Sequence, residues 1–284
     1  MVAVNVTKHL TLGHSPDPDD AFMFYGLARQ AIATRGWTFK HVLADIQTLN
    51  ERALRGELDV TAVSIHAYPH VADKYALANC GGSVGDGYGP VVVAREAMGV
   101  DDLRGLTIAV PGEMTTAFLT LSLLLGVGGF KHTVVMFDRI LDHVASGKVD
   151  AGLIIHEGQL TYQRHKLHRV LDLGAWWRSA AGLPLPLGGN CIRRDLGKDA
   201  MSEVAGIMKL SIEYSLTHRA EAVDYALEFA RDMGSELADK FVGMYVNRWT
   251  VDYGDVGRRA ICELLRRAHG IGLVPSLGEI DFVG

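Results

Sequence analysis

The stretch Gly56-Glu-Leu-Asp59-Val-Thr-Ala-Val-Ser64 places a glycine and an acidic residue directly before a run of apolar residues. A similar stretch, Gly147-Lys-Val-Asp150-Ala-Gly-Leu-Ile-Ile155, follows 91 residues later (150 − 59). In both, the glycine ends a helical pattern and the apolar run is typical of a buried strand. Leu10-Thr-Leu12 and Leu106-Thr-Ile108 begin the two halves at a similar offset, 96 residues (106 − 10). The sequence therefore predicts two similar α/β lobes.

Strand-like and helix-like segments alternate as far as about residue 195, and only amphipathic helices follow from about Lys198 to His269. This alternation predicts mostly parallel sheets with helices on both faces, that is, two doubly wound lobes. The expected strands are Leu10–Gly13, Trp37–Leu43, Val60–Ile65, Ala76–Asn79, Val91–Ala94, Leu106–Val110, Thr133–Phe137, Ala151–Ile155 and His168–Leu173. The expected helices of this part are Phe22–Arg29, Thr48–Arg55, Thr115–Leu125 and Arg139–Ser146.

The chain is expected to cross between the lobes twice, at Val91–Arg95 and at Pro184–Arg193. Residues 1–94 and 190–284 then form the first lobe, and residues 95–189 form the second. Two crossings make a hinge over a cleft. Because ligands of open α/β sheets bind at the carboxyl ends of the strands, we expect those ends to face the cleft.

Composition limits the class of protein. The 284 residues are 48% hydrophobic and carry a net charge of −5, which excludes a disordered chain and argues against a nucleic-acid partner. Three widely spaced cysteines form neither a disulfide framework nor a zinc pattern, and they predict reduced thiols in the cytoplasm. The sequence shows no export signal and no apolar run long enough for a membrane span. It carries no signal for an oligomeric state.

Two threonines at a predicted strand end are candidate ligand-binding residues. Thr115 and Thr116 precede the apolar segment Ala117–Leu125, where they fit the start of a helix. The free N–H groups of such a start can bind a carboxylate. The alternative is a helix cap that binds no ligand.

His156 follows the apolar run Gly152–Ile155 at the end of a predicted strand. Imidazole titrates near neutral pH and can act as a general base facing a cleft, although a lone histidine at a strand end is more often a buried structural residue. His14 and His66 compete for the same role because they also follow predicted strands.

Several metal and cofactor motifs fail on context. His156-Glu157 does not begin a zinc-protease motif, because position 160 is Leu where the second histidine is required. Asp17, Asp19 and Asp20 are expected to mark a helix start rather than a metal site. We therefore predict no metal.

The segment around His156 is one of several that resemble a known protein family. Ala151-Gly-Leu-Ile-Ile-His156-Glu157, Asp172-Leu-Gly-Ala-Trp-Trp177 and Gly182-Leu-Pro-Leu-Pro-Leu-Gly188 closely resemble the 1,4-dihydroxy-6-naphthoate synthases, which act in the futalosine route to menaquinone. Asp45-Ile-Gln-Thr-Leu-Asn50 and Val110-Pro-Gly-Glu-Met-Thr-Thr-Ala117 resemble the same family, and the similarity runs from about Leu10 to beyond Asp252.

The resemblance implies a two-lobed fold of the periplasmic solute-receptor type and a carbon–carbon lyase reaction without a cofactor. That reaction converts cyclic dehypoxanthinyl futalosine, a small anionic molecule, into 1,4-dihydroxy-6-naphthoate. The histidine base of the family matches His156. Its substrate-binding residues match five positions, Ala62, Val63, Ser64, Thr115 and Thr116.

Two departures from the family pattern keep alternatives open. The family commonly has Cys-Pro-Asn-Asp-Thr where this chain has Asp17-Pro-Asp19-Asp20-Ala21, and often has Lys where this chain has Ala62. A lost cation and added acids weaken the attraction of an anionic substrate. The alternatives are a chorismate dehydratase of the same pathway and a non-catalytic protein that binds a small carboxylate.

Overall fold

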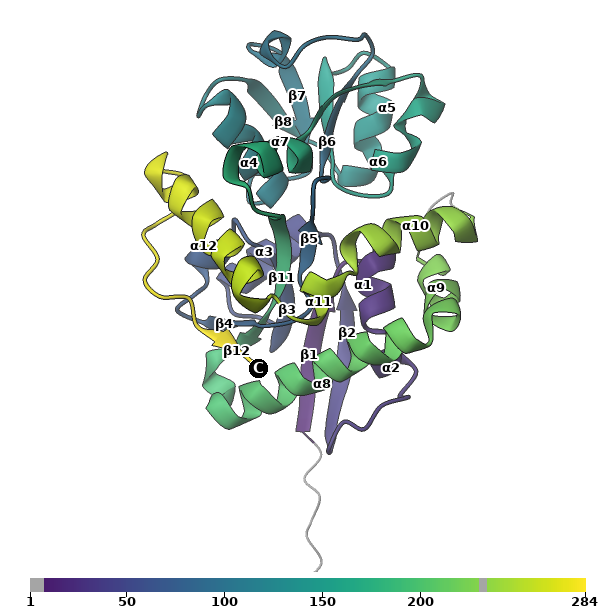
Figure 1. Cartoon of the computed structure of the whole chain (residues 1–284), viewed down its shortest axis with the longest axis vertical. Helices are drawn as coiled ribbons and strands as arrows, with labels where there is room; N and C mark the ends of the chain where they lie inside the picture. Colours follow the sequence, from purple (N-terminus) through teal and green to yellow (C-terminus); the bar gives the residue numbers. More distant parts are fainter. Residues whose placement is uncertain (1–7, 230–233) are drawn as a thin grey trace, which may run out of the picture.

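The computed structural model describes residues 8–229 and 234–284, and the strands of this part form two sheets (Figure 1). The larger sheet has the order β12-β4-β11-β3-β1-β2, with β5 paired to β11. Its strands are β1 (Lys8–His14), β2 (Trp37–Leu43), β3 (Val60–Ser64), β4 (Tyr75–Ala78), β5 (Ser83–Gly85), β11 (Leu185–Arg193) and β12 (Phe282–Val283).

The smaller sheet lies above the larger one in Figure 1 and has the order β10-β6-β9-β7-β8. Its strands are β6 (Val91–Ala94), β7 (Thr107–Val110), β8 (Lys131–Val134), β9 (Ala151–Ile154) and β10 (His168–Asp172). All nine strands expected from the sequence are confirmed, with ends that shift by at most three residues. Two short strands, β5 and β12, carried no detectable pattern.

The expectation of mostly parallel sheets is wrong, because both sheets are mixed. β1 runs parallel to β2 and β3, and β7 runs parallel to β8 and β9. By contrast, β11 is antiparallel to β3, β4 and β5, and β6 is antiparallel to β9 and β10. A parallel connection within one sheet requires a crossover segment, usually a helix. β6 and β11 instead reach their sheets directly from the other lobe, and they pair antiparallel there.

Helices cover both sheets, and the helices after β11 pack mainly on the larger-sheet side. The longest, α8, packs against α2 and β11, and α9 and α10 pack against α1 (Figure 1). The helices are α1 (Pro18–Met23), α2 (Tyr25–Ala28), α3 (Ile46–Leu54), α4 (Thr116–Leu125), α5 (Ile140–Ala145), α6 (Gly158–Thr161), α7 (Leu173–Ala181), α8 (Lys198–Thr217), α9 (Arg219–Leu227), α10 (Ser235–Tyr245), α11 (Arg248–Val251) and α12 (Gly254–Gly270). In the described part of the chain, no helix is long and apolar enough to cross a membrane.

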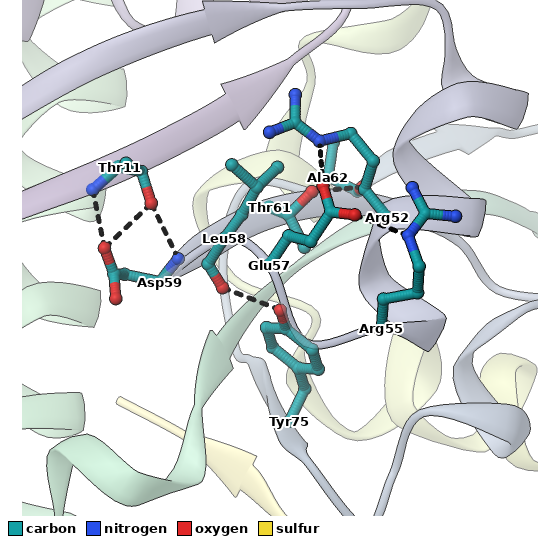
Figure 2. Close-up of polar contacts among 9 residues, drawn as sticks. All are labelled: Thr11, Arg52, Arg55, Glu57, Leu58, Asp59, Thr61, Ala62 and Tyr75. Carbon is teal, nitrogen blue, oxygen red and sulfur yellow. Dashed lines mark hydrogen bonds and ion pairs between the residues drawn. The ribbon is translucent and has the colours of Figure 1, made fainter.

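The two copies of the repeated stretch make the same contact at the start of their strands. Asp59 Oδ2 accepts hydrogen bonds from the Thr11 backbone N–H and from Thr11 Oγ1, both at 2.8 Å (Figure 2). In the smaller sheet, Asp150 Oδ2 accepts from the Thr107 backbone N–H at 2.8 Å. Each aspartate therefore joins the strand that it precedes to the first parallel strand of its sheet.

The turns before these aspartates depend on glycine. Gly56 has a φ of +69° and Gly147 a φ of +76°, a left-handed conformation that other residues adopt only with strain. Beside the first turn, the Tyr75 hydroxyl donates to the Leu58 carbonyl at 2.6 Å, and Glu57 pairs with Arg52 and Arg55 (Figure 2).

The division into residues 1–94 with 190–284 and residues 95–189 stays a prediction, and residues 1–7 lie outside the described part. Near the first boundary of this division, at residues 94 and 95, β6 hydrogen-bonds within the smaller sheet. Near the second boundary, at residues 189 and 190, β11 hydrogen-bonds within the larger sheet. One apolar cluster contains both Val63 of the larger sheet and Val92 of the smaller sheet, so the two layers share part of their core.

Candidate active site

A cavity of about 720 Å³, its open mouth included, lies between the two sheets. Its walls come from the carboxyl ends of β1 and β3, the start of α3 and part of β11 on one side, and from the segments that follow β7 and β9 on the other. This volume is in the range of small-molecule sites. The five substrate-binding residues expected from the resemblance all line it: Ala62, Val63, Ser64, Thr115 and Thr116.

The N-terminus of α4 forms one wall of the cavity. Thr115 is the N-cap: its Oγ1 accepts from the Phe118 N–H at 3.2 Å and donates to the Gly112 carbonyl at 2.7 Å. The cap expected from the sequence is therefore confirmed. Thr116 and Ala117, the first two residues of the helix, line the cavity at the end where a helix has free N–H groups. This end can hold an anion.

Thr116 also connects the two sides of the cavity. Its hydroxyl donates to the Leu187 carbonyl at 2.5 Å and accepts from the His66 backbone N–H at 3.1 Å. Both contacts reach segments of the larger sheet or directly after it. The hydroxyl proton of Thr116 is therefore already used within the protein.

Ser64 is held by Asn50, which sequence reasoning did not single out as a site residue. Asn50 Oδ1 accepts from the Ser64 N–H at 2.8 Å, and Asn50 Nδ2 donates to Ser64 Oγ at 3.0 Å. The same Nδ2 is 3.4 Å from the carbonyl oxygen of Met114, in the loop before α4. Asn50 thus joins α3 to the opposite wall, and its only sequence signal was its place in a family-like segment.

Three acidic residues line the cavity at the start of α1, where the sequence predicted a helix start. Burial and the nearby Asp17 raise the pKa of Asp19 to about 7. Burial and Asp19 raise the pKa of Asp20 well above its usual range, although the Ser15 N–H donates to Asp20 Oδ2 at 2.7 Å. Asp19 therefore exchanges its proton close to neutral pH, and Asp20 keeps its proton to a higher pH than an ordinary carboxyl does.

Among the described residues that line the cavity, none is Lys or Arg. An anionic ligand must then be held by neutral donors, such as the free N–H groups at the start of α4. The protonated state of Asp19 reduces the repulsion that its charge would cause.

His156 lies directly after Ile155, which lines the cavity, but its own ring is not part of the cavity wall. Its Nε2 is 2.9 Å from the Phe137 carbonyl oxygen, and its Nδ1 accepts from the Gly158 N–H at 2.9 Å. A carbonyl only accepts, so these partners assign the proton of the neutral ring to Nε2 and leave the lone pair on Nδ1. The ring borders a separate groove next to Glu157 and His165.

The surroundings of His156 favour its charged form. Burial alone lowers the pKa of His156, but Glu157 outweighs burial, with its Oε2 3.5 Å from Nδ1, and the pKa is raised. The two neighbours of Nδ1 compete, because the Gly158 N–H needs the lone pair and the Glu157 carboxylate favours a proton there. The ring is therefore set to take up a proton at Nδ1.

The two competing histidines do not line the cavity either. His14 Nε2 is 2.9 Å from His41 Nδ1, and burial together with His41 lowers the pKa of His14 to about 4. His66 Nδ1 is 3.3 Å from the Thr115 carbonyl oxygen, and burial lowers the pKa of His66. Both are neutral at physiological pH.

Tyr245, at the end of α10, is a cavity residue that the sequence did not reveal. It lies 89 residues after His156 (245 − 156) in a segment read only as amphipathic helix. Its hydroxyl donates to Gln159 Oε1 at 2.7 Å, across from the larger-sheet side to α6.

Comparison with known proteins identifies the family. A family model described as "Menaquinone biosynthesis" matches residues 10–270. A 1,4-dihydroxy-6-naphtoate synthase from Thermus thermophilus is 44% identical over 93% of this chain and 95% of its own length. The chain belongs to the 1,4-dihydroxy-6-naphthoate synthase family. A synthase of the same name from Streptomyces coelicolor is 42% identical over 95% of this chain and 96% of its own.

Solved structures show the fold of this member of the synthase family. A protein from Archaeoglobus fulgidus has 44% identity and a TM-score of 0.89, covering 94% of this chain and 98% of its own. A Candida albicans protein described as having the generic periplasmic binding protein fold has 13% identity and a TM-score of 0.72, with coverages of 96% and 92%. The alkanesulfonate-binding protein SsuA from Xanthomonas axonopodis has 13% identity and a TM-score of 0.70, with 94% of both chains covered. The two-lobed receptor-type fold expected from the sequence is confirmed.

Proposed function

We propose that this protein is a carbon–carbon lyase that converts cyclic dehypoxanthinyl futalosine into 1,4-dihydroxy-6-naphthoate, with His156 as the general base. The observation that carries the proposal is the 44% identity to a 1,4-dihydroxy-6-naphtoate synthase over nearly the full length of both chains. A cavity between the sheets, lined by the five expected substrate-binding residues, supports it. The proposal includes a cytoplasmic location and a reaction without a cofactor.

The N-terminus of α4 is the proposed seat of the substrate carboxylate. The N–H groups of Thr116 and Ala117 belong to the first turn, and the positive end of the helix dipole favours an anion. Ala62, Val63 and Ser64 then form the opposite wall against the body of the substrate. The threonine hydroxyls act indirectly, since their protons are donated to Gly112 and Leu187.

His156 is proposed to accept the substrate proton at Nδ1. This requires the ring to give up the Gly158 N–H and turn toward the cavity beside Ile155, a rearrangement of the kind that substrate binding often produces. In the resulting imidazolium, Glu157 offsets the positive charge. The raised pKa of His156 supports the role, because a stronger base takes the proton more readily.

A direct assay tests the proposal. Purified protein is mixed with cyclic dehypoxanthinyl futalosine, and formation of the naphthoate is followed by mass spectrometry. A parallel reaction contains chorismate, the substrate of the sister enzyme. We expect naphthoate in the first reaction and no turnover in the second. Turnover of chorismate alone, or binding of either compound without turnover, would contradict the proposal.

A further inference from the structure

Most hydroxyl groups on the cavity wall have no proton left for a ligand. Four of them donate to acceptors of the protein itself: Ser83, Thr115, Thr116 and Tyr245. Because the described wall also lacks Lys and Arg, an oxygen-rich anionic substrate meets few free donors there. Any unused donor next to the cavity is therefore a candidate contact.

Gln159 holds such a donor. It is 6% exposed, its Oε1 accepts from the Tyr245 hydroxyl, and its Nε2 has no hydrogen-bond partner within the described structure. Buried amide groups are nearly always paired, and leaving one unpaired is costly. Gln159 lies directly behind the cavity wall, because the hydroxyl of Tyr245, a wall residue, is 2.7 Å from the other end of the same amide.

Tyr245 is held firmly enough to orient this amide. Its carbonyl accepts from Thr250 Oγ1 at 2.8 Å, and its ring contacts Phe241 and Tyr88 with centroids 5.2 and 6.1 Å apart. Gln159 is also held from its own side, because its backbone N–H donates to the His156 carbonyl at 2.9 Å. The amide is thus fixed between the C-terminal helices and the segment that carries His156.

We propose that Gln159 is a substrate-binding residue whose Nε2 donates a hydrogen bond to an oxygen atom of the substrate, and that Tyr245 is the positioning residue that orients the amide. The inference rests on the proposed function, since it assigns the ligand as the oxygenated, anionic carbocycle of that reaction. A neutral donor suits this place, because burying the charge of a lysine would be costly. The donor also has to hold the anion near Asp19, whose carboxylate repels an anion once it is ionised.

The variants would behave differently if the Tyr245–Gln159 hydrogen bond served only to join the two sides of the cavity. If the Tyr245–Gln159 bond only stabilises the fold, the single variants melt at a lower temperature and KM is unchanged in every variant. If Nε2 binds substrate, KM rises in Gln159→Leu and in the double variant. The double variant separates the two readings, because it leaves no buried group unpaired and therefore melts close to wild type.

The test compares Gln159→Leu, Tyr245→Phe and the double variant with wild type, using KM and kcat for cyclic dehypoxanthinyl futalosine, calorimetric Kd for 1,4-dihydroxy-6-naphthoate, and thermal melts. Gln163→Leu, the same substitution at an exposed position, is the matched control. We expect Gln159→Leu to raise KM and Kd about tenfold, the worth of one lost hydrogen bond. The double variant should match it in KM while melting close to wild type.

If the wild-type enzyme turns over the substrate and the double variant has the same KM and Kd, this inference is overturned and the proposed function stays intact. A KM that rises equally in Gln163→Leu would also overturn it. A wild type that neither turns over the substrate nor binds the naphthoate would overturn the proposed function, and this inference with it.

Discussion

The carboxylate of Asp150 accepts a hydrogen bond from the backbone N–H of Thr107 at 2.8 Å. Asp59 makes the same contact with Thr11 at the same distance in the other sheet. The weak sequence repeat therefore has a structural cause: in each sheet, an aspartate after a left-handed glycine fixes the register of the strand that leads into the cavity.

Replacement of Asp150 or of Asp59 should destabilise the protein, and replacement of Asp59 should do so more strongly. Asp150→Ala should lower the free energy of unfolding by about 1–2 kcal/mol, since one charge-assisted bond is lost. Asp59→Ala should cost more, because Asp59 also accepts from Thr11 Oγ1 and pairs with Arg193 at 3.1 Å. Urea unfolding measures both, with Asp101→Ala, at an exposed carboxylate, as the control. Equal effects for Asp59 and Asp101 would contradict the structural role.

Replacement of His156 tests the proposed base. His156→Asn should lower kcat by about 10²–10⁴, the usual contribution of a general base, with a melting temperature within a few degrees of wild type. His168→Asn, at an exposed position of β10, serves as the matched control. Turnover near the wild-type rate in His156→Asn would remove this residue from the mechanism.

The Thr115 hydroxyl and the helix N–H groups can be separated by substitution. Thr115→Val removes the bonds to Phe118 and Gly112, and should lower the free energy of unfolding by about 1 kcal/mol. KM should change little, because the proposed carboxylate contacts are backbone N–H groups. Kinetics measured beside thermal melts check this, and a large rise in KM without loss of stability would instead make the hydroxyl a direct substrate contact.

Asp19 should make substrate binding and stability depend on pH. Its native pKa of about 7 lies above its value of 3.8 in the unfolded chain, so the native state binds more protons between these values. Its contribution to stability is complete below pH 3.8 and is lost as the pH rises through about 7. Over the same rise, a charge appears beside Asp17 and Asp20 and repels an anionic substrate.

We therefore expect KM to increase between pH 6 and 8, and Asp19→Asn to flatten that increase. The same variant should unfold at a higher urea concentration than wild type at pH 8, with a smaller difference at pH 5. Parallel KM profiles for wild type and variant would show that Asp19 does not titrate in the cavity.

Neighbouring residues were enough to predict much of the architecture. The run Val60–Ser64 is buried throughout, as its mostly apolar pattern indicated, and Thr115 caps the helix that its position before Ala117–Leu125 predicted. β11 was expected only as the crossing segment Pro184–Arg193, and its pairing direction could not be predicted, because a strand's local sequence looks the same in parallel and antiparallel pairing.

The sequence by itself determined the two lobes, the strands that end at the cavity and the family, since these depend on local periodicity, turn glycines and contiguous motifs. Tertiary structure alone decided which way the His156 ring turns, that Asn50 reaches Met114, and that Tyr245 meets Gln159. The physical reason is range: a strand pattern is written in adjacent residues, whereas a hydrogen bond between residues 86 positions apart forms only after α10 packs across the cavity.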